Sequence, residues 1–185
     1  MVLKMDKFTV SIIGESGSGK TTLIKRLIPE LIKRGYKVGT IKHTHHNFEI
    51  DKPGKDSWIH KRAGASSVAI SSKNKIAFIK ELDDEDPVKE LIFKLFSDVD
   101  ILLIEGYKDN NFPIIEVMGA EKYCESFSKS SLLLMVVSKI PLSLSIPVYS
   151  PQEITKITDY LEEKMHSFYK SSWEELSLTS KNLFK

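Results

Sequence analysis

One segment near the start of the chain restricts its fold more than any other: an apolar, β-branched run that leads directly into a glycine-rich loop. The run is FTVSIIG, residues 8–14, and the loop is GESGSGKT, residues 14–21. The loop matches the pattern G-x-x-x-x-G-K-[ST] at every fixed position, and a helical repeat of leucine and isoleucine follows it. Glycines let the backbone N–H groups of such a loop point at phosphate oxygens, and the helix N-terminus adds its partial positive charge. A strand, this loop and a helix in sequence predict a chain that binds a nucleoside triphosphate.

The loop supplies the first candidate binding residues. Lys20 can reach the β- and γ-phosphates of a bound nucleotide, and the hydroxyl of Thr21 can ligate Mg²⁺. The predicted nucleotide-binding residues are Gly14, Glu15, Ser16, Gly17, Ser18, Gly19, Lys20 and Thr21.

Phosphoryl chemistry also needs an acidic side chain near the metal, at the end of a neighbouring strand. The stretch DVDILLIEG, residues 98–106, offers Asp100 at its start and Glu105 at its end. Ligands of an open parallel sheet gather at the carboxyl ends of the strands, so Glu105 is predicted to lie near the metal. Lys20 and Glu105 are thus the candidate catalytic residues. Plain surface exposure is the alternative for Glu105, and Asp100 is interpreted as a strand-start or capping residue.

Strand and helix patterns alternate along the rest of the chain. Further strands are predicted at residues 36–43, 98–106, 112–117, 132–138 and 146–150, with a hairpin around a Lys-Asn-Lys turn in residues 66–81. Predicted helices run from the loop to Gly35 with a kink or break at Pro29, from Pro87 to Phe96, and onward from a capping box of Ser150 and Glu153.

This alternation predicts an α/β fold, the three-layer sandwich of P-loop NTPases. Its mostly parallel sheet would carry helices on both faces and an inserted β-hairpin. We expect residues 1–166 to form the nucleotide-binding domain. Residues 167–185 show no clear period and are expected to be a loosely ordered C-terminal extension.

Composition excludes several classes of protein. The formal net charge of +2 is too small for the dense basic face that nucleic-acid binding usually needs. Cys124 is the only cysteine, which excludes an intrachain disulfide and argues against a thiolate zinc site. No apolar run reaches the length of a membrane span, so we expect a cytoplasmic protein without membrane contact. Only Arg26, Arg34 and Arg62 are arginines, which disfavours a kinase with an arginine-bearing lid.

A second unusual stretch, KHTHHNFEIDKPGKDS at residues 42–57, holds three of the five histidines. Three interpretations of His43, His45 and His46 stay open: a metal site, a loop that faces the ligand's phosphates, or plain surface residues. Against a metal site, His46 points away from the other two if the strand continues, and no thiolate is nearby. A loop in this position usually lies beside the γ-phosphate, where switch regions occur.

Four motifs occur in a distinctive order and spacing: GESGSGKTTL, KHTHH.F..DKPGKDS, AGA at residues 63–65, and DILLIEGYK followed by FPIIEV. Together they resemble the molybdopterin-guanine dinucleotide biosynthesis protein B family over roughly residues 8–118. The resemblance implies a GTP-binding adapter protein that assists the attachment of GMP to molybdopterin in molybdenum cofactor biosynthesis. It further implies GTP and Mg²⁺ as cofactors, weak GTPase activity at most, a homodimer, and molybdopterin and its guanylyltransferase as partners.

The resemblance also extends the candidate site. It adds Thr22, Lys42 and His43 to the nucleotide-binding residues, and it groups Asp56 with Thr21 and Glu105 near the metal. The late strand runs into SKIP, residues 138–141, where guanine-specific proteins often carry Asn-Lys-x-Asp, so GTP over ATP is implied by the resemblance alone. Two other functions stay open: an NTPase that delivers nickel or zinc through the histidines during metal-centre assembly, and a small-molecule kinase.

Overall fold

The computed structural model describes residues 7–81, 92, 95–108, 111–119 and 130–183, with side chains up to residue 171. The chain forms two compact units: residues 1–44 together with 96–185, and residues 45–95. The first unit contains the phosphate loop. Most of the helix predicted from Pro87 to Phe96 lies outside the described residues, as does Cys124.

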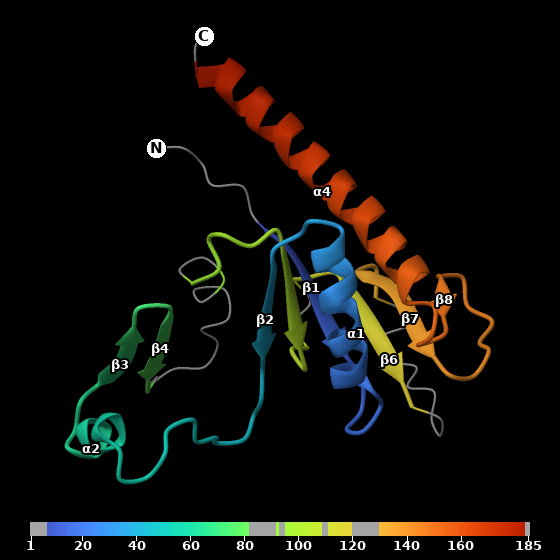
Figure 1. Ribbon diagram of the computed structural model, residues 1–185. Helices are drawn as coiled ribbons and strands as arrows, with labels where there is room; N and C mark the ends of the chain where they lie inside the picture. Colours follow the sequence, from blue (N-terminus) through green and yellow to red (C-terminus); the bar gives the residue numbers. More distant parts are fainter. Residues whose placement is uncertain (1–6, 82–91, 93–94, 109–110, 120–129, 184–185) are drawn as a thin grey trace. The chain divides into compact units, whose positions relative to one another are not determined.

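A six-stranded sheet forms the centre of the first unit (Figure 1). Its strand order is β2-β5-β1-β6-β7-β8, and every neighbouring pair is parallel. The strands are β1 (Phe8–Ile13), β2 (Val38–Lys42), β5 (Ile101–Glu105), β6 (Ile114–Met118), β7 (Leu133–Ser138) and β8 (Val148–Tyr149). Each of them overlaps a predicted strand. β1, β5 and β6 are buried at every position, as expected for central parallel strands that are covered on both faces.

Helix α1 (Lys20–Lys33) follows the phosphate loop, as predicted. Its inner face consists of four buried residues at helical spacing: Leu23, Ile24, Leu27 and Leu31. Gly35 ends the helix with φ 93°, a left-handed conformation that glycine adopts without strain. The helix continues through Pro29, so the break considered at that residue is absent. Pro29 is exposed, where water can satisfy the backbone carbonyl that loses its partner.

Helix α4 (Ile154–Leu183) differs from the prediction at both ends. The carboxylate of Glu153 accepts a hydrogen bond from the Ser150 N–H at 2.9 Å, which is one half of the predicted capping box. The Glu153 N–H bonds the Ser150 carbonyl in a turn, so the helix begins at Ile154 rather than at Pro151. The boundary predicted after residue 166 falls inside this uninterrupted helix. Within it, the hydroxyl of Tyr169 still contacts the sheet, donating to the carbonyl of Asp100 at 2.8 Å.

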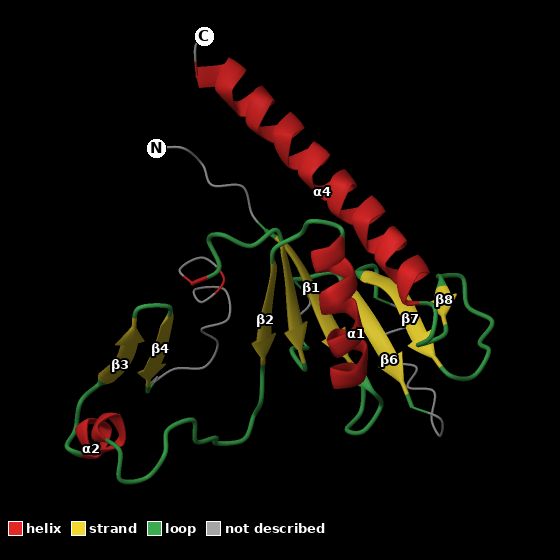
Figure 2. Ribbon diagram, in the orientation of Figure 1, coloured by secondary structure: helices red, strands yellow, loops and turns green. Residues whose placement is uncertain are grey.

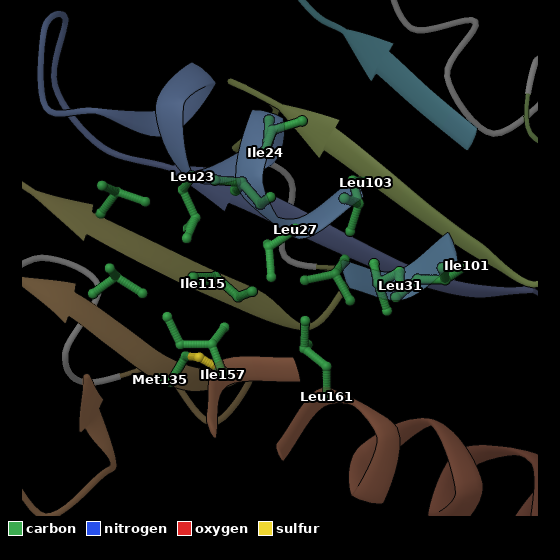
Figure 3. Close-up of a cluster of buried hydrophobic side chains, with 14 of the residues drawn as sticks. Leu23, Ile24, Leu27, Leu31, Ile101, Leu103, Ile115, Met135, Ile157 and Leu161 are labelled. Atoms are coloured by element: carbon green, nitrogen blue, oxygen red, sulfur yellow. The ribbon is translucent and has the colours of Figure 1, made fainter. Parts of the chain in front are cut away.

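Helices α1 and α4 pack on the same face of the sheet and enclose the main core (Figure 3). Arg34, which follows α1, joins the two helices through ion pairs with Glu30 of α1 and with Asp159 and Glu162 of α4. On the opposite face, part of the cover over β6 and β7 comes from the irregular segment 139–147, through Leu142, Leu144 and Ile146. No described helix combines the length and the apolar composition that a membrane span requires.

The second unit contains a short helix, α2 (Asp56–Arg62), and a hairpin of β3 (Ser67–Ser72) and β4 (Lys75–Lys80) (Figure 2). Ser72 pairs with Lys75, so Lys73 and Asn74 form the turn, and the predicted hairpin is confirmed. Among the unit's described residues, Val68 is the only buried hydrophobic one. Large apolar side chains of this unit are exposed instead: Phe48, Ile50, Ile59, Ile70, Ile76 and Phe78.

Candidate functional site

The phosphate loop lies at the carboxyl ends of three adjacent strands. In the register of the sheet, Glu105 of β5 pairs with Ile12 of β1 on one side and with Lys42 of β2 on the other. The loop starts at Gly14, two residues after Ile12, so it begins beside the ends of β5 and β2. Open α/β sheets bind their ligands at this edge. The strand order therefore brings together the loop, Glu105 and Lys42.

The loop needs glycine at its first position for a steric reason. Gly14 has φ 146°, and a Cβ built there would lie 2.2 Å from the carbonyl oxygen of Val117 and 2.7 Å from Oγ of Ser18. Gly17 and Gly19 also have positive φ, at 75° and 106°, but neither is as closely surrounded. The backbone of Val117, near the end of β6, thus lies so close to the start of the loop that only glycine fits at residue 14.

Lys20, the first residue of α1, folds back over the loop. Its Nζ donates to the carbonyl oxygen of Gly14 at 2.9 Å and to that of Glu15 at 2.6 Å. Burial lowers the pKa of Lys20; Glu105 opposes this shift, while Lys42 and Lys108 add to it. The ammonium is therefore held among like charges at the mouth of the loop, a place that favours an anionic ligand.

Glu105 is the centre of the site's hydrogen bonding. The residue is 8% exposed, and its Oε1 accepts from the hydroxyl of Thr21 at 2.9 Å and also pairs with Nζ of Lys42. Burial raises the pKa of Glu105, but the hydrogen bonds from Lys42 and Thr21 and the nearby positive charges outweigh it, so the pKa lies below its usual value. Glu105 is therefore ionised at neutral pH.

Thr21 and Glu105 present oxygen donors that suit a hard divalent cation. A hydroxyl and a carboxylate are the ligand types that Mg²⁺ takes in phosphoryl-transfer sites. One cation, the Lys42 ammonium, already lies against Glu105 Oε1, so this oxygen is placed to face positive charge. Within the described ranges, no group of three His, Cys, Asp or Glu side chains lies close enough to hold a metal ion by itself.

His43 lies beside Glu105, at the end of β2. Its backbone N–H donates to the carbonyl oxygen of Glu105 at 2.9 Å, and its ring meets the ring of Tyr107 edge-on, with the ring centroids 5.0 Å apart. The structure therefore brings together the loop, Lys42, His43 and Glu105, while Thr22 is exposed on the first turn of α1.

The remaining predicted residues fall in the second unit. His45 and His46 begin that unit, and Asp56 is the first residue of α2.

Asp100 lies at the other end of β5, where its carboxylate accepts the N–H of Lys37 at 2.7 Å. This contact fits the capping role predicted for Asp100.

Two charged residues at this edge, Glu116 and Lys108, were not among the predicted site residues. Glu116 of β6 lies opposite Ile13 of β1 and is 3% exposed. Burial raises the pKa of Glu116, and Lys108, which follows the end of β5, partly opposes the shift. The available signal was a glutamate inside the apolar run FPIIEV, where strand positions are otherwise hydrophobic.

Replacing Glu116 with glutamine is expected to make stability less dependent on pH. Because burial raises the folded-state pKa of Glu116, the wild-type chain loses stability as pH rises through that pKa. Glutamine is neutral throughout, so E116Q should be the more stable protein at pH 8, and its advantage should shrink toward pH 4. Urea unfolding at pH 4, 6 and 8 measures this, and an equal difference at all three values would contradict it.

Comparisons with known proteins agree with this geometry. The model of the family "molybdopterin guanine dinucleotide synthesis protein B" matches residues 9–139. The molybdopterin-guanine dinucleotide biosynthesis adapter protein of Haemophilus influenzae is 35% identical over 161 residues, which make up 86% of this chain and 90% of that protein. The protein of the same description from Escherichia coli is 36% identical over 156 residues, 81% of this chain and 89% of that protein.

A solved structure shows the same fold. The crystal structure of a MobB protein homolog from Bacillus stearothermophilus superposes with a TM-score of 0.67 at 21% identity, covering 86% of this chain and 98% of that one. The α/β fold with a mostly parallel sheet, predicted from the strand and loop patterns, is thereby confirmed. Taken with the family match and the two relatives, this shows that the chain belongs to the molybdopterin guanine dinucleotide synthesis protein B family.

Proposed function

We propose that this chain binds GTP together with Mg²⁺ and acts as an adapter that assists the attachment of GMP to molybdopterin. The observation that carries the proposal is the convergence of the phosphate loop with Thr21, Glu105 and Lys42 at one edge of the sheet. Family membership supports the adapter role, because the relatives from Haemophilus influenzae and Escherichia coli carry the description of biosynthesis adapter protein.

The triphosphate lies against the loop in this proposal. Backbone N–H groups of residues 14–22 bind the phosphate oxygens, and Lys20 leaves the carbonyls of Gly14 and Glu15 for the β- and γ-phosphates. Lys42 and His43 complete the phosphate-facing side from the end of β2. The choice of GTP over ATP rests on family membership.

Thr21 and Glu105 hold Mg²⁺ in this proposal, Glu105 through a water. The metal would neutralise charge on the phosphates. Slow GTP hydrolysis by the chain itself is part of this proposal, because the contacts of the first unit's two arginines lie away from the phosphate loop, whereas an arginine finger must reach the phosphates. Arg26 donates to the carbonyl of Pro151, and Arg34 is held by three carboxylates.

The macromolecular partner in this proposal is the molybdopterin guanylyltransferase, with molybdopterin as its substrate.

A homodimer formed through the second unit is the other proposed assembly. It is supported by the exposed apolar side chains of that unit, such as Ile70, Ile76 and Phe78, on a unit with a single buried hydrophobic residue among those described. Light scattering at micromolar concentration should give twice the chain mass of 21.0 kDa; a mass of one chain would contradict the dimer.

A reconstituted reaction tests the adapter role. The guanylyltransferase, molybdopterin, GTP and Mg²⁺ are combined with and without this chain, and the guanine dinucleotide formed is quantified. The proposal predicts a higher rate with the chain and no such increase with a Lys20→Ala variant. An equal rate in all three reactions would contradict the adapter role, whatever the nucleotide affinity of the chain.

A further inference from the structure

Lys20 and Lys42 both lie at the loop, and they have different partners. Lys20 donates to carbonyl oxygens of the loop itself, at Gly14 and Glu15. Lys42 pairs instead with Oε1 of Glu105. The same oxygen accepts the Thr21 hydroxyl at 2.9 Å. Lys42 therefore lies where the two oxygen donors suited to Mg²⁺ meet.

The two ends of this ion pair differ in their freedom to move. The Glu105 side chain is 10% exposed and is fixed by its strand and by Thr21, whereas the Lys42 side chain is 64% exposed. Lys42 is the last residue of β2, an edge strand, and its four methylenes let the ammonium turn about without movement of the backbone. Glu105 is thus a fixed acceptor, and Lys42 is a movable cation.

We propose that Lys42 is an exchanging cation, which neutralises Glu105 in the metal-free protein and turns to the terminal phosphate of the nucleotide when Mg²⁺ is bound. The proposal rests on the proposed binding of a nucleotide with Mg²⁺ at this loop. Lys42 cannot keep its place against Oε1 beside a divalent cation, because like charges at such a distance repel. A third phosphate, next to Lys20 and Thr21, offers the displaced ammonium a partner of opposite charge.

Removal of the Lys42 charge should change two measurable quantities, the affinity for the metal and the preference for triphosphate over diphosphate. Lys42 competes with the metal for Glu105, so removing its charge should strengthen metal binding. An ion pair at the upper end of the range measured for exposed pairs corresponds to roughly a fivefold change. Lys42 also pairs with the terminal phosphate, so its removal should weaken triphosphate more than diphosphate binding, by roughly the same factor. If Lys42 were a surface residue without a role at the site, its replacement would change neither the metal affinity nor the preference for triphosphate.

Three variants separate these roles. Lys42→Met keeps most of the side chain's length without its charge, and Lys42→Arg keeps the charge. Lys37→Met removes an exposed lysine just before the start of β2, at the opposite end of the strand. Mn²⁺ affinity of each protein saturated with inorganic pyrophosphate is measured by electron paramagnetic resonance. Calorimetry with inorganic tripolyphosphate and with pyrophosphate, each with Mg²⁺, compares the affinities for three and for two phosphates without any contribution from a nucleotide's base or ribose.

The expected result for Lys42→Met is Mn²⁺ binding that is about fivefold tighter and a preference for tripolyphosphate that is about fivefold smaller. Lys42→Arg and Lys37→Met should stay close to the wild type in both measurements. Unchanged values for Lys42→Met, or weaker Mn²⁺ binding, would overturn the exchange. Wild-type protein that binds tripolyphosphate but not GTP would count against the proposed function alone, whereas wild-type protein that binds neither would overturn both.

Discussion

A Gly14→Ala variant is expected to lose roughly 3 kcal/mol or more of folding free energy and to lose nucleotide binding with it. The added Cβ would lie 2.2 Å from the carbonyl oxygen of Val117, in backbone that belongs to a fully buried strand and cannot move aside. The φ of 146° also falls in a region that alanine rarely adopts. Urea unfolding followed by circular dichroism measures the loss.

Gly35→Ala is the matched control. Gly35 also has a positive φ, 93°, but apart from its chain neighbours no atom lies within 4 Å of a Cβ built there. Its alanine variant should therefore lose only the conformational part, about 1 kcal/mol. Equal losses of folding free energy in the two variants would show that the contact with Val117 does not require glycine at the start of the loop.

Replacing Lys20 with alanine is expected to weaken nucleotide binding by about 10- to 100-fold, because hydrogen bonds to charged groups contribute about 1.5–3 kcal/mol each. The folded state should be little affected, since Lys20 contacts carbonyl oxygens of its own loop and its ammonium is partly desolvated among other lysines. Calorimetric titration of the variant with the wild type's preferred nucleotide measures the change.

Lys25→Ala provides the control for Lys20→Ala. Lys25 is exposed on the next turn of α1, so its removal takes the same charge from the same helix without touching the loop. It should bind nucleotide within about twofold of the wild type. If the two variants bound equally well, the phosphates would not be held by Lys20.

Two kinds of site feature could be predicted from the sequence: residues that follow one another along the chain, and residues whose place depends only on which end of a strand they occupy. The loop and its helix follow one another along the chain, so a motif describes them completely. Glu105 could be preferred to Asp100 because the two lie at opposite ends of one strand, and the loop must lie at the carboxyl end. The structure has Glu105 hydrogen-bonded to Thr21 and Asp100 bound to the N–H of Lys37.

Other features depend on which strands are neighbours, and a single sequence does not contain that information. Lys42 meets Glu105 because β2 pairs with β5, although 63 residues separate them. Glu116 reaches the same edge because β6 lies on the other side of β1. A glutamate in an apolar run could have indicated burial, but not its place beside the loop.

The face of the sheet on which each helix packs, and the length of α4, could not be predicted from the sequence pattern either. α1 and α4 share one face of the sheet, which depends on how each connection crosses the sheet rather than on the periodicity of either helix. The stretch after residue 166 has no clear apolar repeat, yet the structure continues α4 through it to Leu183. Local helix propensity and the contact of Tyr169 with the sheet can extend a helix without such a repeat.

The most direct test of the central claim is calorimetric titration of the metal-free, full-length protein with GTP and then with ATP, each with Mg²⁺. The account predicts binding near one nucleotide per chain, with a clear preference for GTP. Equal affinity for the two nucleotides, or a preference for ATP, would contradict the assignment of GTP. It would also remove the link between this phosphate loop and the transfer of GMP to molybdopterin.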